Sequence, residues 1–173
     1  EVFALRGAHD TLLNNNGETK VQLTNDPMLQ PWFGGFQGMH WLPGDGGISF
    51  KARRWLGAAP VEGGLYTATL VYRADGNILG ITAQPTAPAL SFALDPDGWP
   101  AFGKYTLGLS TTQVAYIDRP ETGLWVADLP TGTRTRIYSG AVHSLDWSQD
   151  GTKILFGAGG TIRTIKPGGT GLK

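Results

Sequence analysis

Histidine and tryptophan are the residue types in this sequence most able to bind a ligand or take part in catalysis. The 173-residue chain holds three His, six Trp and no Cys. His40 stands one residue before Trp41, and His143 stands four residues before Trp147. A neutral imidazole both donates and accepts a hydrogen bond and titrates near neutral pH. His40 and His143 are therefore candidate binding residues, with an ordinary solvent-facing or hydrogen-bonded strand His as the alternative.

Three tryptophans lie in predicted loops, outside any repeated pattern: Trp32, Trp55 and Trp99. An exposed indole offers a large apolar face together with one hydrogen-bond donor, so it can stack on sugars or anchor a protein partner. These three are the second set of candidate binding residues. The other three occupy matching positions of the repeat described below, where we expect them to pack between units: Trp41, Trp125 and Trp147.

No motif in the chain indicates catalysis or a bound metal. The histidines have no carboxylate at a spacing that builds a metal site. Asp95-Pro96-Asp97-Gly98 lacks the distal Glu of a calcium loop and is typical of a turn. A Gly-x-Ser-x-Gly nucleophile motif is absent, and the glycines at 157–160 are not followed by a phosphate-binding helix. We predict a protein without catalytic residues, metal or cofactor.

Charge and hydropathy exclude two classes of partner. The chain has 14 basic and 14 acidic residues and a formal net charge of zero, with no basic stripe for nucleic acid. No apolar run approaches the roughly 18–20 residues that a membrane-spanning helix needs, so we expect no membrane insertion. The lack of Cys excludes disulfides and is compatible with secretion.

The pattern of glycines, prolines and apolar residues predicts an all-β chain. With 26 Gly and 11 Pro, no segment sustains an amphipathic helical pattern over a dozen residues. The clearest hairpin is 144–156, where Asp150-Gly151 joins two β-prone runs with residues that tolerate positive φ. Arg53–Gly64 is predicted to be a polar, Gly-rich connection, and Ala89–Leu94 a strand that opens a new unit.

A repeat of this hairpin organises the chain. Trp41, Leu94 and Trp147 recur at an interval of 53 residues, each before a turn. A four-stranded unit recurring at about 40–50 residues is the signature of a β-propeller built from four-stranded antiparallel blades. The sequence predicts about three and a half blades in a single propeller or propeller segment spanning 1–173: a partial blade 1–27, blades 28–85 and 86–140, and a partial blade 141–173.

Several segments also resemble the repeats of TolB-like (WD-type) propeller proteins. The sequence 147–156, Trp-Ser-Gln-Asp-Gly-Thr-Lys-Ile-Leu-Phe, is similar to the core of such a repeat. Residues 11–27 look like the second half of a blade, and 123–128 like a third strand. The resemblance implies a non-enzymatic, periplasmic or extracellular protein that binds a protein or peptide partner.

The predicted number of blades does not show how the propeller ring closes. Propellers close with about 4–8 blades, so a further chain segment, self-association, or the leading strand Val2–Leu5 added to the last blade would be needed. Two alternatives to the interaction module also stay open. One is an accessory propeller domain of a larger hydrolase or peptidase, and the other is a structural subunit of an extracellular assembly.

Overall fold

The computed structural model describes residues 3–5, 20–32, 39–72, 74, 76, 78–109, 112–119 and 121–173. Regular structure in these ranges is β-strand throughout, apart from one 3-10 turn, η1 (Pro43–Asp45). The all-β prediction is confirmed. None of the described helical structure is long and apolar enough to cross a membrane. His9 lies outside the described residues, as do residues 11–19 of the segment that resembles the second half of a blade.

The strands are short, and most are joined to the next by a tight turn. In chain order they are β1 (Phe3–Leu5), β2 (Lys20–Gln22), β3 (Leu29–Pro31), β4 (Met39–Trp41), β5 (Gly47–Leu56), β6 (Ala59–Tyr72), β7 (Ile78–Ile81), β8 (Leu90–Phe92), β9 (Phe102–Leu107), β10 (Gln113–Asp118), β11 (Gly123–Asp128), β12 (Arg134–Ser139), β13 (Ser144–Trp147), β14 (Ile154–Ala158) and β15 (Thr161–Ile165).

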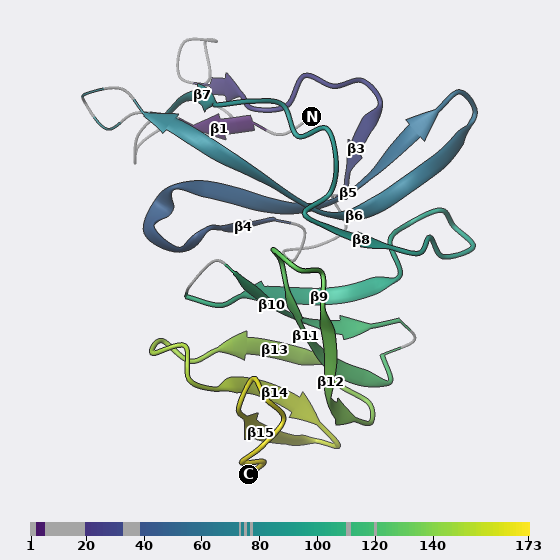
Figure 1. The fold of residues 1–173 in the computed structure, drawn as a ribbon, viewed down its shortest axis with the longest axis vertical. Coiled ribbons are helices and arrows are strands. Elements are labelled where there is room, and N and C mark those ends of the chain that lie inside the picture. The colour runs from purple at the N-terminus through teal and green to yellow at the C-terminus, as the bar shows by residue number, and fades with distance from the viewer. Residues whose placement is uncertain are drawn as a thin grey trace.

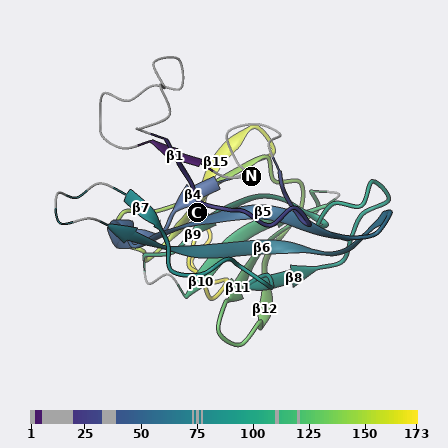
Figure 2. The same cartoon turned by 90° about the horizontal axis from the view of Figure 1, so that it is seen from above.

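Three sheets follow one another along the chain and lie in successive layers (Figure 1). The first holds β3 to β8, the second β9 to β12, and the third β13 to β15. The small β1–β2 pair lies beyond the first sheet, near β7 (Figure 1). Seen from above, the long β5 and β6 strands cross the upper layer from side to side (Figure 2).

The first sheet is built on the long β5–β6 hairpin, which carries two pairs of flanking strands. β4 and β7 flank one half of the hairpin, while β3 and β8 flank the other. The prediction of a loop over Arg53–Gly64 is wrong, because β5 continues to Leu56 and β6 begins at Ala59. Gly64 faces β8 so closely that a Cβ would lie 2.3 Å from the Leu90 carbonyl oxygen. That glycine marks the close approach of another strand and not a flexible connection.

The second sheet begins later than predicted. β8, within the predicted strand Ala89–Leu94, pairs with β6 and so belongs to the first sheet. Leu94 itself forms only an isolated bridge with Pro100. The sheet opens with β9 and then runs as a simple antiparallel meander through β10 and β11 to β12.

The observed register replaces Leu94 with Leu107 in the repeat. Trp41 is opposite Ile48, Leu107 is opposite Val114, and Trp147 is opposite Ile154. Each pair spans seven residues, so the first hairpins of the three sheets share one geometry. The regular 53-residue interval is therefore wrong, because the long β5–β6 hairpin and the β8 strand lengthen the segment between Trp41 and Leu107.

The third sheet has three strands, and the chain then returns to its outer edge. Lys173 and Thr164 exchange both backbone hydrogen bonds, each 3.0 Å long. The leading strand does not complete this sheet as the sequence suggested. β1 pairs with β2, with Ala4 opposite Val21.

Apolar side chains fill the space between successive layers. One cluster lies on the β2 and β7 side of the first sheet, a second between the first and second sheets, and a third between the second and third. β10 contributes to two of them, because Val114 and Tyr116 face the first sheet while Ala115 and Ile117 face the third. A strand buried on both faces reads as an unbroken apolar run, as this one does.

Candidate functional site

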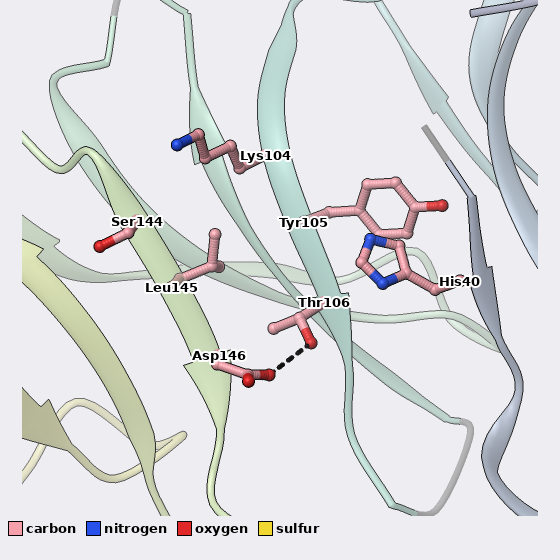
Figure 3. A pocket seen from close by; sticks show the side chains of 7 residues that line it. All are labelled: His40, Lys104, Tyr105, Thr106, Ser144, Leu145 and Asp146. Atoms are coloured by element: carbon pink, nitrogen blue, oxygen red, sulfur yellow. Dashed lines mark hydrogen bonds between the residues drawn. The ribbon is translucent and has the colours of Figure 1, made fainter. Parts of the chain in front are cut away.

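One strand from each of the three sheets contributes to a single pocket (Figure 3). Its volume is about 230 Å³. β4 supplies His40, and the rest of the lining comes from neighbouring positions on β9 and β13: Lys104, Tyr105, Thr106, Ser144, Leu145 and Asp146. Residues separated by more than a hundred positions thus share one site.

Strand periodicity explains which polar groups line the pocket. Lys104 and Thr106 are two residues apart on β9, and Ser144 and Asp146 are two apart on β13. Side chains at i and i+2 of a strand project to the same side. Two neighbouring strands therefore present four polar side chains to one space.

His40 lies at the edge of the pocket against the ring of Tyr105. The two rings meet edge to face, with centroids 4.5 Å apart. The Nε2 atom of His40 is buried and has no hydrogen-bond partner among the described residues. Burial lowers the pKa of His40, and the negative charge of Asp146 opposes that shift only in part. The imidazole is therefore neutral at neutral pH, with hydrogen-bonding capacity to offer a ligand.

Asp146 is held in place by its neighbours. Its Oδ1 accepts a hydrogen bond from the Thr106 hydroxyl at 3.2 Å and another from the Trp147 backbone N–H at 2.8 Å. The Trp147 indole N–H donates in turn to the Thr106 carbonyl at 3.3 Å. These bonds tie β9 to β13 and fix the orientation of the carboxylate.

The pocket brings a Ser, a His and an Asp together, which the sequence did not predict. No hydrogen bond joins Ser144, His40 and Asp146 to one another among the described contacts, and the His40 Nε2 lacks the partner that a general base needs. Among the described residues no group of three or more His, Asp or Glu side chains could hold a metal ion. In the described part of the chain these three side chains therefore do not form a hydrogen-bonded catalytic triad.

The three tryptophans that the sequence placed in loops gather into a second cluster, and none of them lines the pocket. Trp55 lies in strand β5. Trp32 and Trp99 meet edge to face with ring centroids 4.4 Å apart. The Arg53 guanidinium lies between two indoles, 3.8 Å from the Trp99 centroid and 4.8 Å from that of Trp55. We call Trp32, Arg53, Trp55 and Trp99 the Trp–Arg cluster. All four side chains are half-buried, so part of each indole is covered by the protein.

Hydrogen bonds close the Trp–Arg cluster on itself. The Gln30 side-chain oxygen accepts from Arg53 Nε at 2.9 Å and from the Trp55 indole N–H at 2.8 Å. Arg53 also donates to the Asp97 carbonyl at 2.8 Å. The cluster therefore joins β3, the β5–β6 hairpin and the 95–100 turn.

A buried amine lies beneath this cluster. Lys51 is 2% exposed, and its Nζ lies 5.2 Å from the Trp32 ring centroid and 4.6 Å from that of Phe102. The Nζ donates a hydrogen bond to the Phe102 carbonyl. Burial lowers the pKa of Lys51 to about 8, helped by the positive charge of Arg119 and opposed by Asp95.

Other sequence-predicted positions lie outside both sites. His143 is exposed, and its Nδ1 lies 3.8 Å from a Glu121 carboxylate oxygen. Trp41 is 56% exposed, so its predicted packing between units is wrong. Trp125 and Trp147 do pack against the buried clusters.

Only part of the pocket can be recognised from the sequence. His40 was found because it precedes a Trp on an opening strand. The sequence pattern does not predict strand β9. The alternation of its side chains at Lys104, Tyr105 and Thr106 was therefore not available as a signal. Asp146 stands inside the best-defined hairpin, and its partner Thr106 is 40 residues away in sequence.

Comparison with known proteins gives a similarity at the level of structure. No protein-family model matches the chain, and no curated protein sequence matches it. Among solved structures, the chain resembles in fold a protein assigned as TolB from Agrobacterium tumefaciens, with 14% identity and a TM-score of 0.44. The similarity covers 79% of this chain and 60% of that one, so the chain matches less than two thirds of that protein's length.

Proposed function

We propose that the three stacked sheets are consecutive blades of a β-propeller and that the chain is a non-enzymatic binding module. Its ligand lies in the pocket between β4, β9 and β13. The observation that carries this proposal is the convergence on one polar pocket of β4, β9 and β13, each the first strand of a hairpin with the same register. In a propeller, the opening strand of each blade borders the central channel.

Sheet topology supports the propeller assignment. The second sheet is a four-stranded meander that begins at the pocket and ends at β12, far from it in strand order. The third sheet repeats the same start, with Trp147 in the register position of Leu107. Successive sheets pack through apolar layers, as blades do.

The volume of the pocket limits the size of the ligand. About 230 Å³ is below the usual range of about 300–1,000 Å³ for drug-sized ligands. It suits a small molecule, or one or two side chains of a protein or peptide partner. The periplasmic or extracellular location is proposed on the family resemblance alone.

An NMR titration of the histidine side chains tests this function. We expect small polar ligands or peptides that enter the pocket to shift the ring signals of His40. The exposed His143 serves as an internal control whose signals should stay unchanged. A ligand that binds without moving the His40 signals would contradict the proposed site.

Self-association is a second candidate, favoured by the outward face of the third sheet. Leu155 is 43% exposed and Ile162 is 78% exposed on that face, and both line a shallow hollow of about 220 Å³. Exposed apolar positions on one sheet face are suited to packing against a second copy of the chain. Light scattering should then show oligomers that a Leu155→Ser, Ile162→Ser double variant loses, whereas a wild-type monomer at all concentrations would contradict self-association.

A further inference from the structure

We propose that the pocket between β4, β9 and β13 binds a small zwitterion, a molecule with an ammonium group at one end and a carboxylate at the other. This ligand class rests on the proposed binding function. It follows from two opposite charges that face the same pocket without pairing with each other.

The first charged end is formed by hydrogen-bond donors. Lys104 lines the pocket with Ser144, and Figure 3 shows both toward the same end of it. Lys104 forms no ion pair within 4.0 Å among the described residues. An ammonium and a hydroxyl together can bind a carboxylate through charge-assisted hydrogen bonds.

The second charged end is formed by acceptors. Asp146 also lacks an ion pair within the described part of the chain, and its carboxylate is fixed by Thr106. The neutral imidazole of His40 lies on the other side of this end (Figure 3). A ligand ammonium has three donors, so it can bond to the carboxylate and to an imidazole nitrogen at once.

The space between the two ends is small and partly apolar. Leu145 lies between the charged groups, while the ring of Tyr105 packs against His40 on the other side of β9 (Figure 3). The volume of about 230 Å³ accommodates a short aliphatic chain between an ammonium and a carboxylate. A ligand with only one charged group would leave either Lys104 or Asp146 without an oppositely charged partner.

Calorimetric titration of the wild-type chain tests the ligand class directly. The probes are glycine, β-alanine and 4-aminobutyrate, compared with ethylamine and propionate, which each carry one of the two charges. We expect the best-fitting zwitterion to bind at least about tenfold tighter than either single-charge probe. Equal affinities for zwitterions and single-charge probes would overturn the inference.

Two variants identify the groups responsible. In Lys104→Met the zwitterion should lose its advantage over ethylamine, and in Asp146→Asn it should lose its advantage over propionate. Lys166→Met and Asp97→Asn alter exposed charges outside the pocket and should leave the affinities unchanged. A zwitterion preference that survives in both pocket variants would overturn the assignment.

The signals of His40 separate failure of the ligand class from failure of the site. If peptides shift the His40 ring signals and the zwitterions do not, the zwitterion inference is wrong and the pocket remains a binding site. If no probe of either kind shifts those signals, the inference and the proposed function both fail.

Discussion

The Trp–Arg cluster and the pocket both combine aromatic rings with polar side chains, but they differ in how many of the polar groups have partners within the protein. In the cluster, Gln30 and backbone carbonyls accept the hydrogen bonds that Arg53 and Trp55 donate. In the pocket, the buried Nε2 of His40 has no partner in the described part of the chain, and Asp146 has no ion pair there. A buried polar group without a partner is costly, which singles out the His40 Nε2, whereas the exposed Asp146 carboxylate is open to a ligand. From this contrast we expect the cluster to stabilise the fold and the pocket to bind the proposed ligand.

Removing a ring from the Trp–Arg cluster should have the largest effect. We expect Trp99→Ala to lower the free energy of unfolding by about 3 kcal/mol, because it removes the partner of Trp32 and one of the two rings that hold Arg53. Urea unfolding measures the change. Trp41→Ala is the matched control, and since Trp41 is 56% exposed it should cost less than about 1 kcal/mol. Equal losses in both variants would contradict a structural role for the cluster.

The buried amine beneath the cluster predicts a rise of stability in alkali. The folded-state pKa of Lys51, about 8, lies below its ordinary value of 10.5, so between these values the unfolded chain binds more protons than the folded one. The free energy of unfolding should therefore rise as the pH increases from about 8, by an amount approaching about 3 kcal/mol near pH 10.5.

Measurement between pH 8 and 10 isolates this rise. Burial raises the pKa of Tyr66, Tyr105 and Tyr116, so these groups lower stability only at higher pH, where the unfolded chain ionises first. Urea unfolding at several pH values should show the rise in the wild type and not in Lys51→Met. A flat wild-type profile would show that Lys51 is not buried as described.

The sequence was sufficient for the parts of the fold that depend on local pattern. The Asp150-Gly151 hairpin formed as predicted, because positive φ at the turn and apolar flanks are local requirements. The β8 strand was assigned to the wrong unit, because its partner is chosen by the close approach permitted at Gly64. That contact joins residues distant in sequence and leaves no periodic signal.

Candidate site residues could be predicted from the sequence only where they belong to a residue type that is often found in binding sites. His40 and the three loop tryptophans stood out by type, but sequence could not show which of them would be satisfied by neighbours. Arg53 covers two of the indoles because strand β5 continues past it, and that extension was read as a loop. The roles of the two sites could be distinguished only from their partners.

A smaller effect is expected from the buried imidazole in acid. Because burial lowers the pKa of His40 below 6.5, the unfolded chain takes up its proton first as the pH falls. The free energy of unfolding should thus decline as the pH falls below about 6.5, with no contribution from His40 above that value. Unfolding between pH 7 and 5 should show this decline in the wild type and in His143→Gln. A decline that persists unchanged in His40→Gln would contradict the burial of this ring.

We expect the smallest effect on the free energy of unfolding from Asp146→Asn. Ligand binding in this variant tests whether the pocket is the binding site. The most direct measurement is the affinity of the best zwitterion for the wild type, Asp146→Asn and Trp99→Ala, each titrated under conditions where it is folded. We expect a loss of at least about tenfold in Asp146→Asn and an unchanged affinity in Trp99→Ala. An unchanged affinity in Asp146→Asn together with a loss in Trp99→Ala would contradict it, and would transfer the binding role to the Trp–Arg cluster.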